Sequence, residues 1–329
     1  MHVAIRQLRT TLALAAIGSA AALACTPAAA QGWPQRPVSF IVSQAAGSSP
    51  DVMARLVADA MSRSLGQGVV IENKPGGGNV IGAAAAARAA PDGYTLFFAT
   101  SAALVTNPYM MKSLSYDPLK DFVPVSLVTQ SHQLVLVHPD LAAKTLPELI
   151  AGDKAEPGKL SVGVDSPRNL AGVTAQALNK RAGINLVLVP YPNINSGLQD
   201  AIAGRIQVGV FSVSIVEALV RDGKLRPLAV ASAKRSEVFP NLPTVAETLP
   251  GFDLSGWFML MAPTGTPADI VKRLQAETAK AVADAKVREM APKLGFELDG
   301  GTSEDAVAFM TSQLALWGKI TKELGIEPQ

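Results

Sequence analysis

A turn of small residues at positions 45–48 holds the groups in this sequence best suited to binding a small anion. It follows an apolar run at 38–42, and Ser48 or Ser49 followed by Pro50 fits the start of a helix. The first N–H groups of a helix lack partners within the helix and carry partial positive charge, so a helix starting here would direct them at a carboxylate or phosphate. The alternative is an ordinary connection between a strand and a helix, because most glycine turns bind nothing.

Hydroxyl side chains end a second predicted strand. Residues 94–99 form a run of apolar and aromatic residues after a Pro-Asp-Gly turn, and Thr100 and Ser101 follow it. Ligands of open parallel sheets bind beyond the carboxyl ends of the strands. We therefore expect Thr100 and Ser101 to lie near the backbone N–H groups at 46–48 and to bind the same ligand.

Asp51 lies in the first turn of the predicted helix. Its negative charge cannot attract an anion, which leaves two roles open. It can cap the helix by accepting hydrogen bonds from backbone N–H groups, or it can accept one from a hydroxyl or ammonium group of a ligand.

The elements that position these residues alternate between strand and helix. Residues 38–42 are too continuously apolar for a strand with one exposed face, so we predict a strand buried on both faces. Apolar residues then recur at helical spacing up to Leu65, and the alternation resumes in the second half of the chain. A periodic helix at 268–283 and a last helix from Ser303 follow. The predicted fold class is α/β, with mostly parallel sheets flanked by helices.

The first thirty residues have the pattern of a secretory signal peptide. Arg6 and Arg9 precede an apolar run at 12–24, no acidic residue occurs, and Ala28 and Ala30 provide a small-residue cleavage site. The run is shorter than the roughly 20 residues that a membrane-spanning helix needs. We therefore predict a leader at 1–30 that is cleaved, and a protein located in the periplasm.

Cys25, the single cysteine of the chain, lies within this leader. A lipid anchor there is the less favoured alternative, because Ala22 rather than leucine stands three residues before it. A mature chain without cysteine excludes disulfides, thiolate metal sites and a cysteine nucleophile. Two of the 29 Lys and Arg residues lie in the leader, so 27 remain against 27 Asp and Glu residues. A chain this close to neutral lacks the basic surface of a nucleic-acid-binding protein.

Patterns typical of catalysis and cofactor binding are absent from the mature sequence. Its two histidines, His132 and His138, lack zinc-ligand spacing, and no strand end carries a Gly-x-Ser-x-Gly or Gly-x-Gly-x-x-Gly motif. The glycines at 76–78 are not followed by Gly-Lys-Ser/Thr and indicate a turn before a helix. We expect no metal, no cofactor and no enzymatic activity. A secreted α/β hydrolase or transferase without a recognisable motif is the alternative, and fold alone does not decide between them.

The start of the mature chain resembles the Bug-type (TctC-like) extracytoplasmic solute-binding proteins of tripartite tricarboxylate transporters. Residues 33–78 read WPQRPVSFIVSQAAGSSPDVMARLVADAMSRSLGQGVVIENKPGGG, where the family pattern is roughly Pro-Phe-x-Ala-Gly-Gly-x-x-Asp. This chain keeps the pattern at Ala46, Gly47 and Asp51 and changes it at Ser43, Gln44 and Ser48. Further family-like motifs follow in order: APDGYTL at 90–96, YDP at 116–118, DF at 121–122, LAVASAKRS at 228–236, LPTVAE at 242–247 and APTGTP at 262–267.

This resemblance implies a two-lobed periplasmic binding protein of type II, a Venus flytrap. It places lobe one at 33–125 and 255–329 and lobe two at 126–254. The implied function is capture of a small organic acid, a carboxylate, between the lobes. The implied partners are the membrane subunits of a tripartite tricarboxylate transporter or a sensor. We expect a monomer that binds no nucleic acid.

The predicted second lobe departs from the family. Members usually carry the loop Gly-Ser-Ala-Gly-x-Gly-Ser-x-x-His-Leu, and the loop at 163–170 is about three residues shorter, with Asn169 at the histidine position. Tyr191 is kept, but Asn193 replaces a family glycine and Ser212 stands where aspartate is common. The shorter loop removes backbone donors. The prediction that a simple dicarboxylate is held by backbone groups at both ends is therefore less secure than the prediction of the fold.

Arg168 is the candidate replacement for these donors. It precedes a predicted helix and can act as a forked clamp for a carboxylate. The alternative is a solvated loop residue or an ion pair with Asp165, because loop arginines are mostly exposed. The predicted ligand-binding residues are Ser43, Gln44, Ala46, Gly47, Ser48, Asp51, Thr100, Ser101, Asp165, Ser166, Arg168, Asn169, Tyr191, Asn193 and Ser212.

Overall fold

The computed structural model describes residues 32–164, 167–191 and 194–329. All described helices and strands lie within residues 36–329, which their contacts group into one unit. The predicted leader and the predicted site residues Asp165, Ser166 and Asn193 lie outside the described residues. Within the described part of the chain, no helix combines the length and apolar character needed to cross a membrane.

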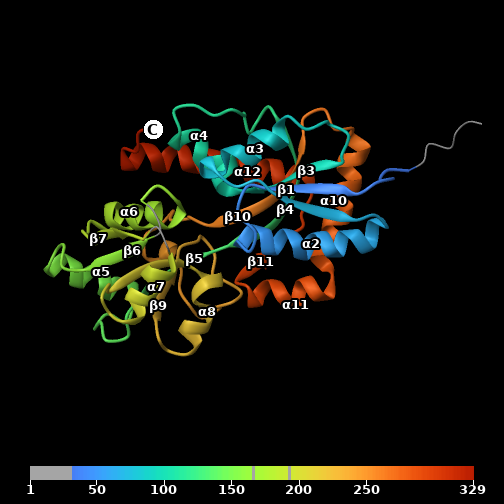
Figure 1. The fold of residues 1–329 in the computed structure, drawn as a ribbon. Helices are drawn as coiled ribbons and strands as arrows, with labels where there is room; N and C mark the ends of the chain where they lie inside the picture. The colour runs from blue at the N-terminus through green and yellow to red at the C-terminus, as the bar shows by residue number, and fades with distance from the viewer. Residues whose placement is uncertain (1–31, 165–166, 192–193) are drawn as a thin grey trace, which may run out of the picture. The chain divides into compact units, whose positions relative to one another are not determined.

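The first sheet has six strands, and their spatial order is β11-β4-β10-β3-β1-β2 (Figure 1). The strands β1, β2 and β3 are parallel, with Phe40 opposite both Ile71 and Leu96. The bounds of the six strands are β1 Val38–Val42, β2 Val69–Asn73, β3 Thr95–Thr100, β4 Phe122–Ser131, β10 Gly256–Pro263 and β11 Phe296–Leu298.

The second sheet has five strands in the order β7-β6-β8-β5-β9. Here β6 pairs in parallel with β7 and β8, whereas β5 pairs antiparallel with β8 and β9. The bounds are β5 Gln133–Val137, β6 Ser161–Val164, β7 Val187–Pro190, β8 Val208–Ser212 and β9 Arg226–Val230.

Four of the six strands of the first sheet and four of the five strands of the second run in one direction, so the prediction of mostly parallel sheets is confirmed, and each sheet also contains antiparallel neighbours. In the first sheet β10 runs antiparallel to both β3 and β4, and β11 runs antiparallel to β4. The reason is topological: β4 leads away from the first sheet and β10 leads back into it, so these neighbours run in opposite directions. Antiparallel neighbours are common at such positions in otherwise parallel sheets.

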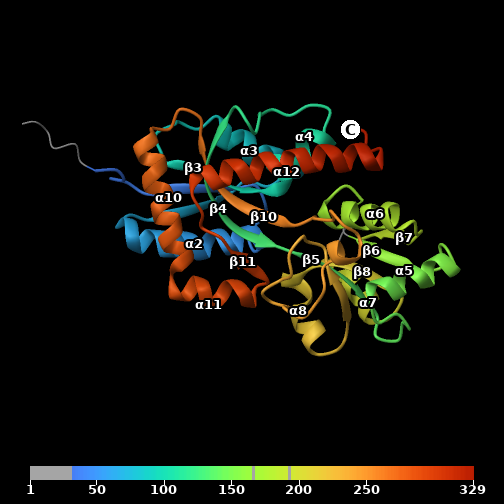
Figure 2. The same cartoon turned by 180° about the vertical axis from the view of Figure 1, so that it is seen from behind.

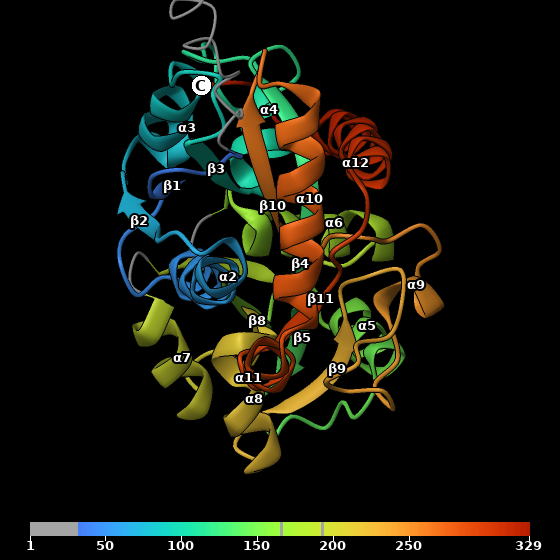
Figure 3. The ribbon, with the colours of Figure 1, turned by 90° about the vertical axis from the view of Figure 1, so that its right-hand side faces the viewer.

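Helices cover the faces of both sheets (Figure 1). Helix α2 contacts β1, β2 and α10, and α12 contacts β4 (Figure 3). Helices α6, α7 and α8 contact strands of the second sheet. The helix bounds are α2 Ser49–Leu65, α3 Val80–Ala87, α4 Asn107–Met110, α5 Leu146–Ala155, α6 Leu170–Ala182, α7 Ile194–Ile202, α8 Val213–Arg221, α9 Val245–Thr248, α10 Ala268–Ala283, α11 Ala285–Lys293 and α12 Ser303–Leu324, with a 3₁₀ turn at Gly77–Asn79 and a π-helical segment at Ala102–Thr106.

The core explains why the strands read as apolar runs. All residues of β10 are buried, and side chains on both faces of β1 are buried, as its sequence predicts. Trp257 is fully buried between the first sheet and α12, where its ring meets the edge of Phe309 at 5.3 Å between centroids. Burial on both faces of the strands fixes their carboxyl ends in space, and these ends carry the candidate site.

The chain passes between the sheets at two places (Figure 2). It leaves the first sheet after Ser131 and enters the second at Gln133, with His132 between them. It returns through Ser255 into β10. Strand β4 therefore continues in the first sheet beyond the predicted boundary at residue 125. We keep the boundaries of the two lobes as a proposal, with the outward crossing moved to His132.

Two elements near the C-terminus are absent from the sequence-based prediction. Helix α11 contains Pro292 in its last turns, and β11 is only three residues long. Both depart from the usual signals, because proline disfavours helix interiors and very short strands leave no periodicity. They matter because β11 places Glu297 beside the crossing at His132, 3.1 Å from its Nε2 atom.

Candidate functional site

The turn between β1 and α2 is held by its own hydrogen bonds. Gly47 has φ 80°, a left-handed conformation that favours glycine, and its N–H donates to Asp51 Oδ2 at 2.8 Å. The N–H of Ser48 donates to the carbonyl of Ala45 at 3.2 Å. The N–H groups of Gly47 and Ser48, predicted to bind the ligand, are therefore occupied within the turn in this structure.

Asp51 organises this turn. Its side chain is 2% exposed and also accepts from Asn73 Nδ2 at 2.9 Å and from both Nε and Nη2 of Arg55. Burial by itself raises the pKa of Asp51, but the hydrogen bonds from Arg55, Gly47 and Asn73 outweigh it and hold the pKa below its usual value. Ser48 is the N-cap residue, yet its side chain makes no capping bond. Of the two roles left open for Asp51, the structure places it in the one that stabilises the helix start.

A cavity of about 310 Å³ lies where the carboxyl ends of β1 and β3 face those of β6 and β8. This volume is in the range of small-molecule sites. Its described lining residues are Gln44, Ser49, Pro50, Asn79, Thr100, Ser101, Ala102, Ser131, Gln133, Asn169, Leu170, Ala171, Ile194, Val210, Phe211, Ser212, Ile215, Gly256, Trp257 and Phe258.

The wall formed by the first sheet is rich in donors. Helix α2 begins at Ser49, and the helical segment after β3 begins beside Ser101, so two helix N-termini lie at the cavity. Thr100 Oγ1 accepts from the N–H of Ala103 at 3.3 Å, which leaves its hydroxyl hydrogen for a ligand. Asn79 Oδ1 accepts from Ser43 Oγ at 3.0 Å, so its amide nitrogen is the part that remains for a ligand. Such a wall suits a carboxylate.

None of the described lining residues carries a charged side chain. Binding of an acid at this wall therefore relies on hydroxyl and amide donors and on the dipoles of the two helix N-termini. Neutral donors satisfy an anion without a paired cation when several converge on it.

Five of the predicted site residues line the cavity, and seven other described ones do not. Those that line it are Gln44, Thr100, Ser101, Asn169 and Ser212. Those outside the lining are Ser43, Ala46, Gly47, Ser48, Asp51, Arg168 and Tyr191. The ligand-binding roles of all these residues stay predictions, and those of Asp165, Ser166 and Asn193 fall outside the described part of the chain.

Arg168 and Tyr191 are held by other parts of the protein. Arg168 Nη2 donates to the carbonyls of Met110 at 2.8 Å and Glu327 at 3.0 Å, so its guanidinium joins the loop before α6 to two segments beside α12. Tyr191 donates its hydroxyl to Asp200 Oδ2 at 2.7 Å, and burial together with this bond raises the pKa of Tyr191. The Arg168 guanidinium, predicted as a carboxylate clamp, and the Tyr191 hydroxyl, predicted to bind the ligand, therefore both make hydrogen bonds within the protein.

The cavity also contains residues that sequence reasoning did not select. Ser131 and Gln133 flank the outward crossing, and Gly256 begins the returning strand. Ser49 is the first residue of α2, and Asn79 immediately precedes α3. These residues share one feature: each lies at the boundary of a helix or strand near a crossing between the sheets. This feature identifies them only when the positions of the crossings are known to within one residue.

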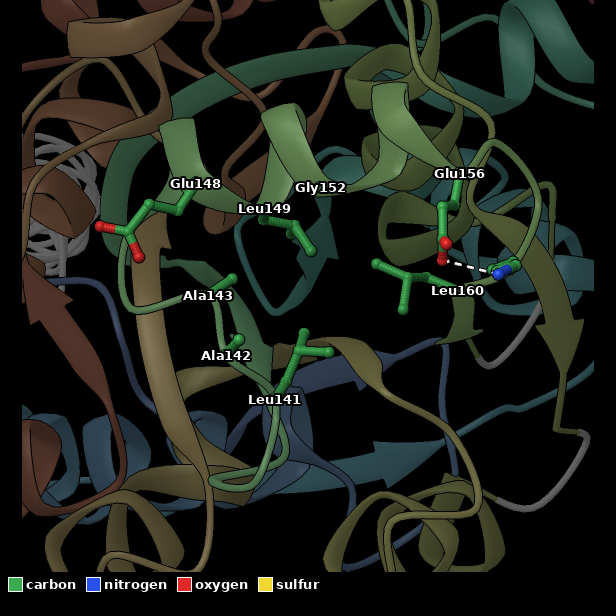
Figure 4. A pocket seen from close by; sticks show the side chains of 9 residues that line it. Leu141, Ala142, Ala143, Glu148, Leu149, Gly152, Glu156 and Leu160 are labelled. Atoms are coloured by element: carbon green, nitrogen blue, oxygen red, sulfur yellow. Dashed lines mark ion pairs between the residues drawn. The ribbon is translucent and has the colours of Figure 1, made fainter.

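A second cavity, of about 390 Å³, lies between the segment 141–143, α5 and the start of β6 (Figure 4). Leu141, Leu149 and Leu160 point into it, and Glu148 and Glu156 stand at its two ends. Glu156 pairs with Lys159 at 2.7 Å. An apolar cavity with carboxylates at its ends repels an anion, so we do not assign it to an acidic ligand.

The helix start at Asp51 gives a testable prediction. Asp51→Asn should lower the free energy of unfolding at pH 7 by roughly 1–2 kcal/mol. This is the contribution of a hydrogen bond to a charged group, reduced because the Arg55 side chain is half exposed and water screens its charge. The folded-state pKa of Asp51 lies below its ordinary value of 3.8, so the stabilisation is present above that value and is lost as pH falls through the folded pKa. Urea unfolding at neutral and acidic pH should therefore show the two proteins converging on acidification.

Asp59→Asn is the matched control. Asp59 pairs with Arg63 on the same helix at the same spacing, but both side chains are half exposed. Solvent screens such a pair, and its loss should have little effect at either pH. Equal effects of the two substitutions at pH 7 would contradict the special role of Asp51.

Comparisons with known proteins show that this chain is similar to receptor proteins in sequence and in fold. A family model described as the tripartite tricarboxylate transporter family receptor matches residues 53–326. Protein BugT of Bordetella pertussis is 34% identical over 316 residues, which is 95% of this chain and 97% of BugT. Among solved structures, R. palustris Rpa4515 with adipate has a TM-score of 0.79 and 31% identity, covering 91% of this chain and 100% of that one. MatC from Rhodopseudomonas palustris with bound malate has a TM-score of 0.73 and 28% identity, covering 88% and 99%.

Proposed function

The chain belongs to the tripartite tricarboxylate transporter receptor family, and from this premise we propose that it captures a small organic acid in the cleft between its two lobes. Members of this family are solute-binding receptors of the periplasm rather than enzymes. The proposed role is delivery of the acid to the membrane subunits of such a transporter or to a sensor. The proposed location is the periplasm, reached through the leader at 1–30.

The observation that carries the proposal is the donor-rich wall of the cavity. Thr100, Ser101, Ser49 and Asn79 bring hydroxyl and amide groups to the point where two helices begin. Relatives with the same fold were solved with adipate and with malate, which are both carboxylates. We infer that one carboxylate of the ligand binds at this wall.

The contribution of Thr100 can be measured directly. Thr100→Val removes one hydroxyl and keeps the shape of the side chain, so carboxylate affinity should fall by about 1.5–3 kcal/mol, the range for a hydrogen bond to a charged group. Adipate and malate are the first ligands to test, by thermal shift and then by calorimetry.

Thr95→Val is the control because Thr95 lies at the other end of the same strand, away from the cavity. It should leave affinity unchanged. Equal affinities of the wild type and the Thr100 variant would remove this wall from the ligand site, and failure of every carboxylate to bind would overturn the proposed function.

A further inference from the structure

Gln133 is a buried polar residue of the cavity that lies outside the donor-rich wall. Its side chain lines the cavity and the residue is only 8% exposed. Within the described part of the chain, no group forms a hydrogen bond with its side-chain amide. This amide offers two N–H donors and one carbonyl acceptor, and a buried amide without partners is unfavourable. The Gln133 side chain is therefore available to a bound ligand.

The position of Gln133 is set by the crossing between the sheets. It is the first residue of β5, directly after His132. It pairs with Ser212 of β8, so these two side chains lie on the same face of the second sheet, and both line the cavity. Gly256, the first residue of the returning strand, lines it as well. Gln133 therefore lies at the junction of the sheets, and the lining extends from there to the donor-rich wall on one side and to the start of α6 on the other.

The other polar groups near Gln133 mainly supply donors. Asn169 Oδ1 caps α6, so the amide nitrogen of Asn169 is the part left for a ligand. The hydroxyls of Ser131, Ser212 and Ser214 form a chain, with Oγ–Oγ distances of 3.2 Å and 2.9 Å. Two bonds use two of these three hydroxyl hydrogens, and one remains. Donors suit a carboxylate, but the Gln133 carbonyl needs a ligand group that carries a hydrogen, which a carboxylate at neutral pH lacks.

We propose that Gln133 is a specificity-determining residue that recognises a hydroxyl group on the chain of the ligand acid. This rests on the proposed function, because a carboxylate of the same ligand binds at Thr100 and Ser101. The hydroxyl donates to Gln133 Oε1 and accepts from Nε2, so it satisfies both sides of the amide. A methylene group at that place satisfies neither. A site built to hydrogen-bond a hydroxyl rejects the analogue that lacks it, because its own buried polar group is then left unpaired.

Acids that differ only by this hydroxyl test the inference. Calorimetry with the purified protein at pH 7 compares malate with succinate and 3-hydroxybutanoate with butanoate, each hydroxy acid as separate enantiomers. In at least one pair, one enantiomer should bind at least about tenfold more tightly than the unsubstituted acid. Equal affinities within both pairs, or binding of adipate but of neither pair, would overturn this inference and leave the proposed function intact. Binding of no acid would overturn both.

Variants of Gln133 assign the preference to this residue. Gln133→Met keeps the length of the side chain and removes the amide, so it should weaken binding of the hydroxy acid alone and reduce the preference to about twofold or less. Gln133→Asn withdraws the amide by one methylene group. It should have the same effect, and it decides the question if the methionine variant does not fold.

Gln199→Met is the matched control, at an exposed position of α7 outside the cavity lining. It should keep the preference of the wild type. Equal weakening of both members of a pair in the Gln133 variants would assign Gln133 to a carboxylate, and an unchanged preference would remove it from ligand recognition. Either result would overturn this inference.

Discussion

Replacing Gly82 with alanine should lower the free energy of unfolding by roughly 1–3 kcal/mol, the usual cost of forcing a methyl group into a packed region. A Cβ atom at Gly82 would lie 2.7 Å from the Cα atom of Ser43 and 2.9 Å from the carbonyl oxygen of Lys74. Both neighbours are backbone atoms, so they cannot rotate away as a flexible side chain can. Either α3 or the turn after β1 must shift.

The same shift should reach the ligand. Ser43 donates to Asn79, and Asn79 and Gln44 both line the cavity, so a displaced turn moves two groups of the donor-rich wall. We expect weaker carboxylate binding in the Gly82 variant in addition to lower stability. Urea unfolding and calorimetry with the same acids measure the two effects separately.

Gly152→Ala provides a matched control, because Gly152 is also helical and a Cβ atom there meets no atom within 4 Å. Alanine is favoured over glycine in a helix by about 1 kcal/mol, so this variant should be slightly more stable than the wild type. If both variants are stabilised to the same extent, then α3 tolerates the methyl group and its close approach to the turn is not required.

The first half of the site follows from local sequence signals. The continuous apolar run of β1, the small turn and Pro50 at the helix start fix where β1 ends and α2 begins. Thr100 and Ser101 reach the same cavity because β3 lies beside β1 in the sheet. Strand ends and helix starts are set by neighbouring residues, so the sequence predicts them well.

The use of each polar group could not be predicted in the same way. The N–H of Gly47 could serve a ligand or Asp51, and both bonds satisfy the same donor. The choice depends on Asn73 and Arg55, which approach Asp51 from another strand and from the next helical turn. The carbonyls that hold Arg168 come from residues 110 and 327, far away in the sequence. Such competition between partners is decided by tertiary structure.

The family assignment and the two-lobed α/β fold are confirmed, because motifs spread over the whole chain carry this information. The part of the cavity lining that comes from the second sheet and its helices is less predictable from family motifs, since this chain changes them at Asn169 and Ser212. The apolar residues of this part, Leu170, Ala171, Ile194, Val210, Phe211 and Ile215, come from the four elements α6, α7, β8 and α8. Their gathering into one surface is a property of the fold rather than of any single motif.

The pair between His132 and Glu297 gives the second large prediction. His132 Nε2 lies 3.1 Å from Glu297 Oε2, and His132 Nδ1 lies 3.0 Å from Ser255 Oγ. Glu297 also accepts from the N–H of Glu237 at 2.7 Å. One carboxylate on β11 therefore contacts the residue of the outward crossing and the segment after β9. This arrangement joins the two sheets beside both crossings.

Glu297→Gln should lower the free energy of unfolding at pH 7 by about 2–3 kcal/mol. A hydrogen bond to a charged group contributes about 1.5–3 kcal/mol, and the upper part of this range applies because the Glu297 side chain is only 19% exposed. Glutamine keeps the size of the side chain and an oxygen for the Glu237 N–H, so the substitution tests the charge.

Glu247→Gln is the matched control. Arg235 lowers the pKa of Glu247 to about 2, but both side chains are exposed and water screens their pair. Little change in stability is expected there.

The dependence on pH separates the charge of Glu297 from its packing. Burial by itself raises the pKa of Glu297, but the hydrogen bond from His132 and the others outweigh it, so the folded-state pKa lies below the ordinary value of 4.5. A carboxyl group with a lowered pKa stabilises the fold above its unfolded value, and this stabilisation is lost as pH falls through the folded pKa. The wild type and the Glu297 variant should therefore differ most near neutral pH and converge in urea unfolding as pH falls below 4.5 and through the folded-state pKa. A difference that stays constant down to low pH would show that the variant loses packing rather than a charged partner of His132.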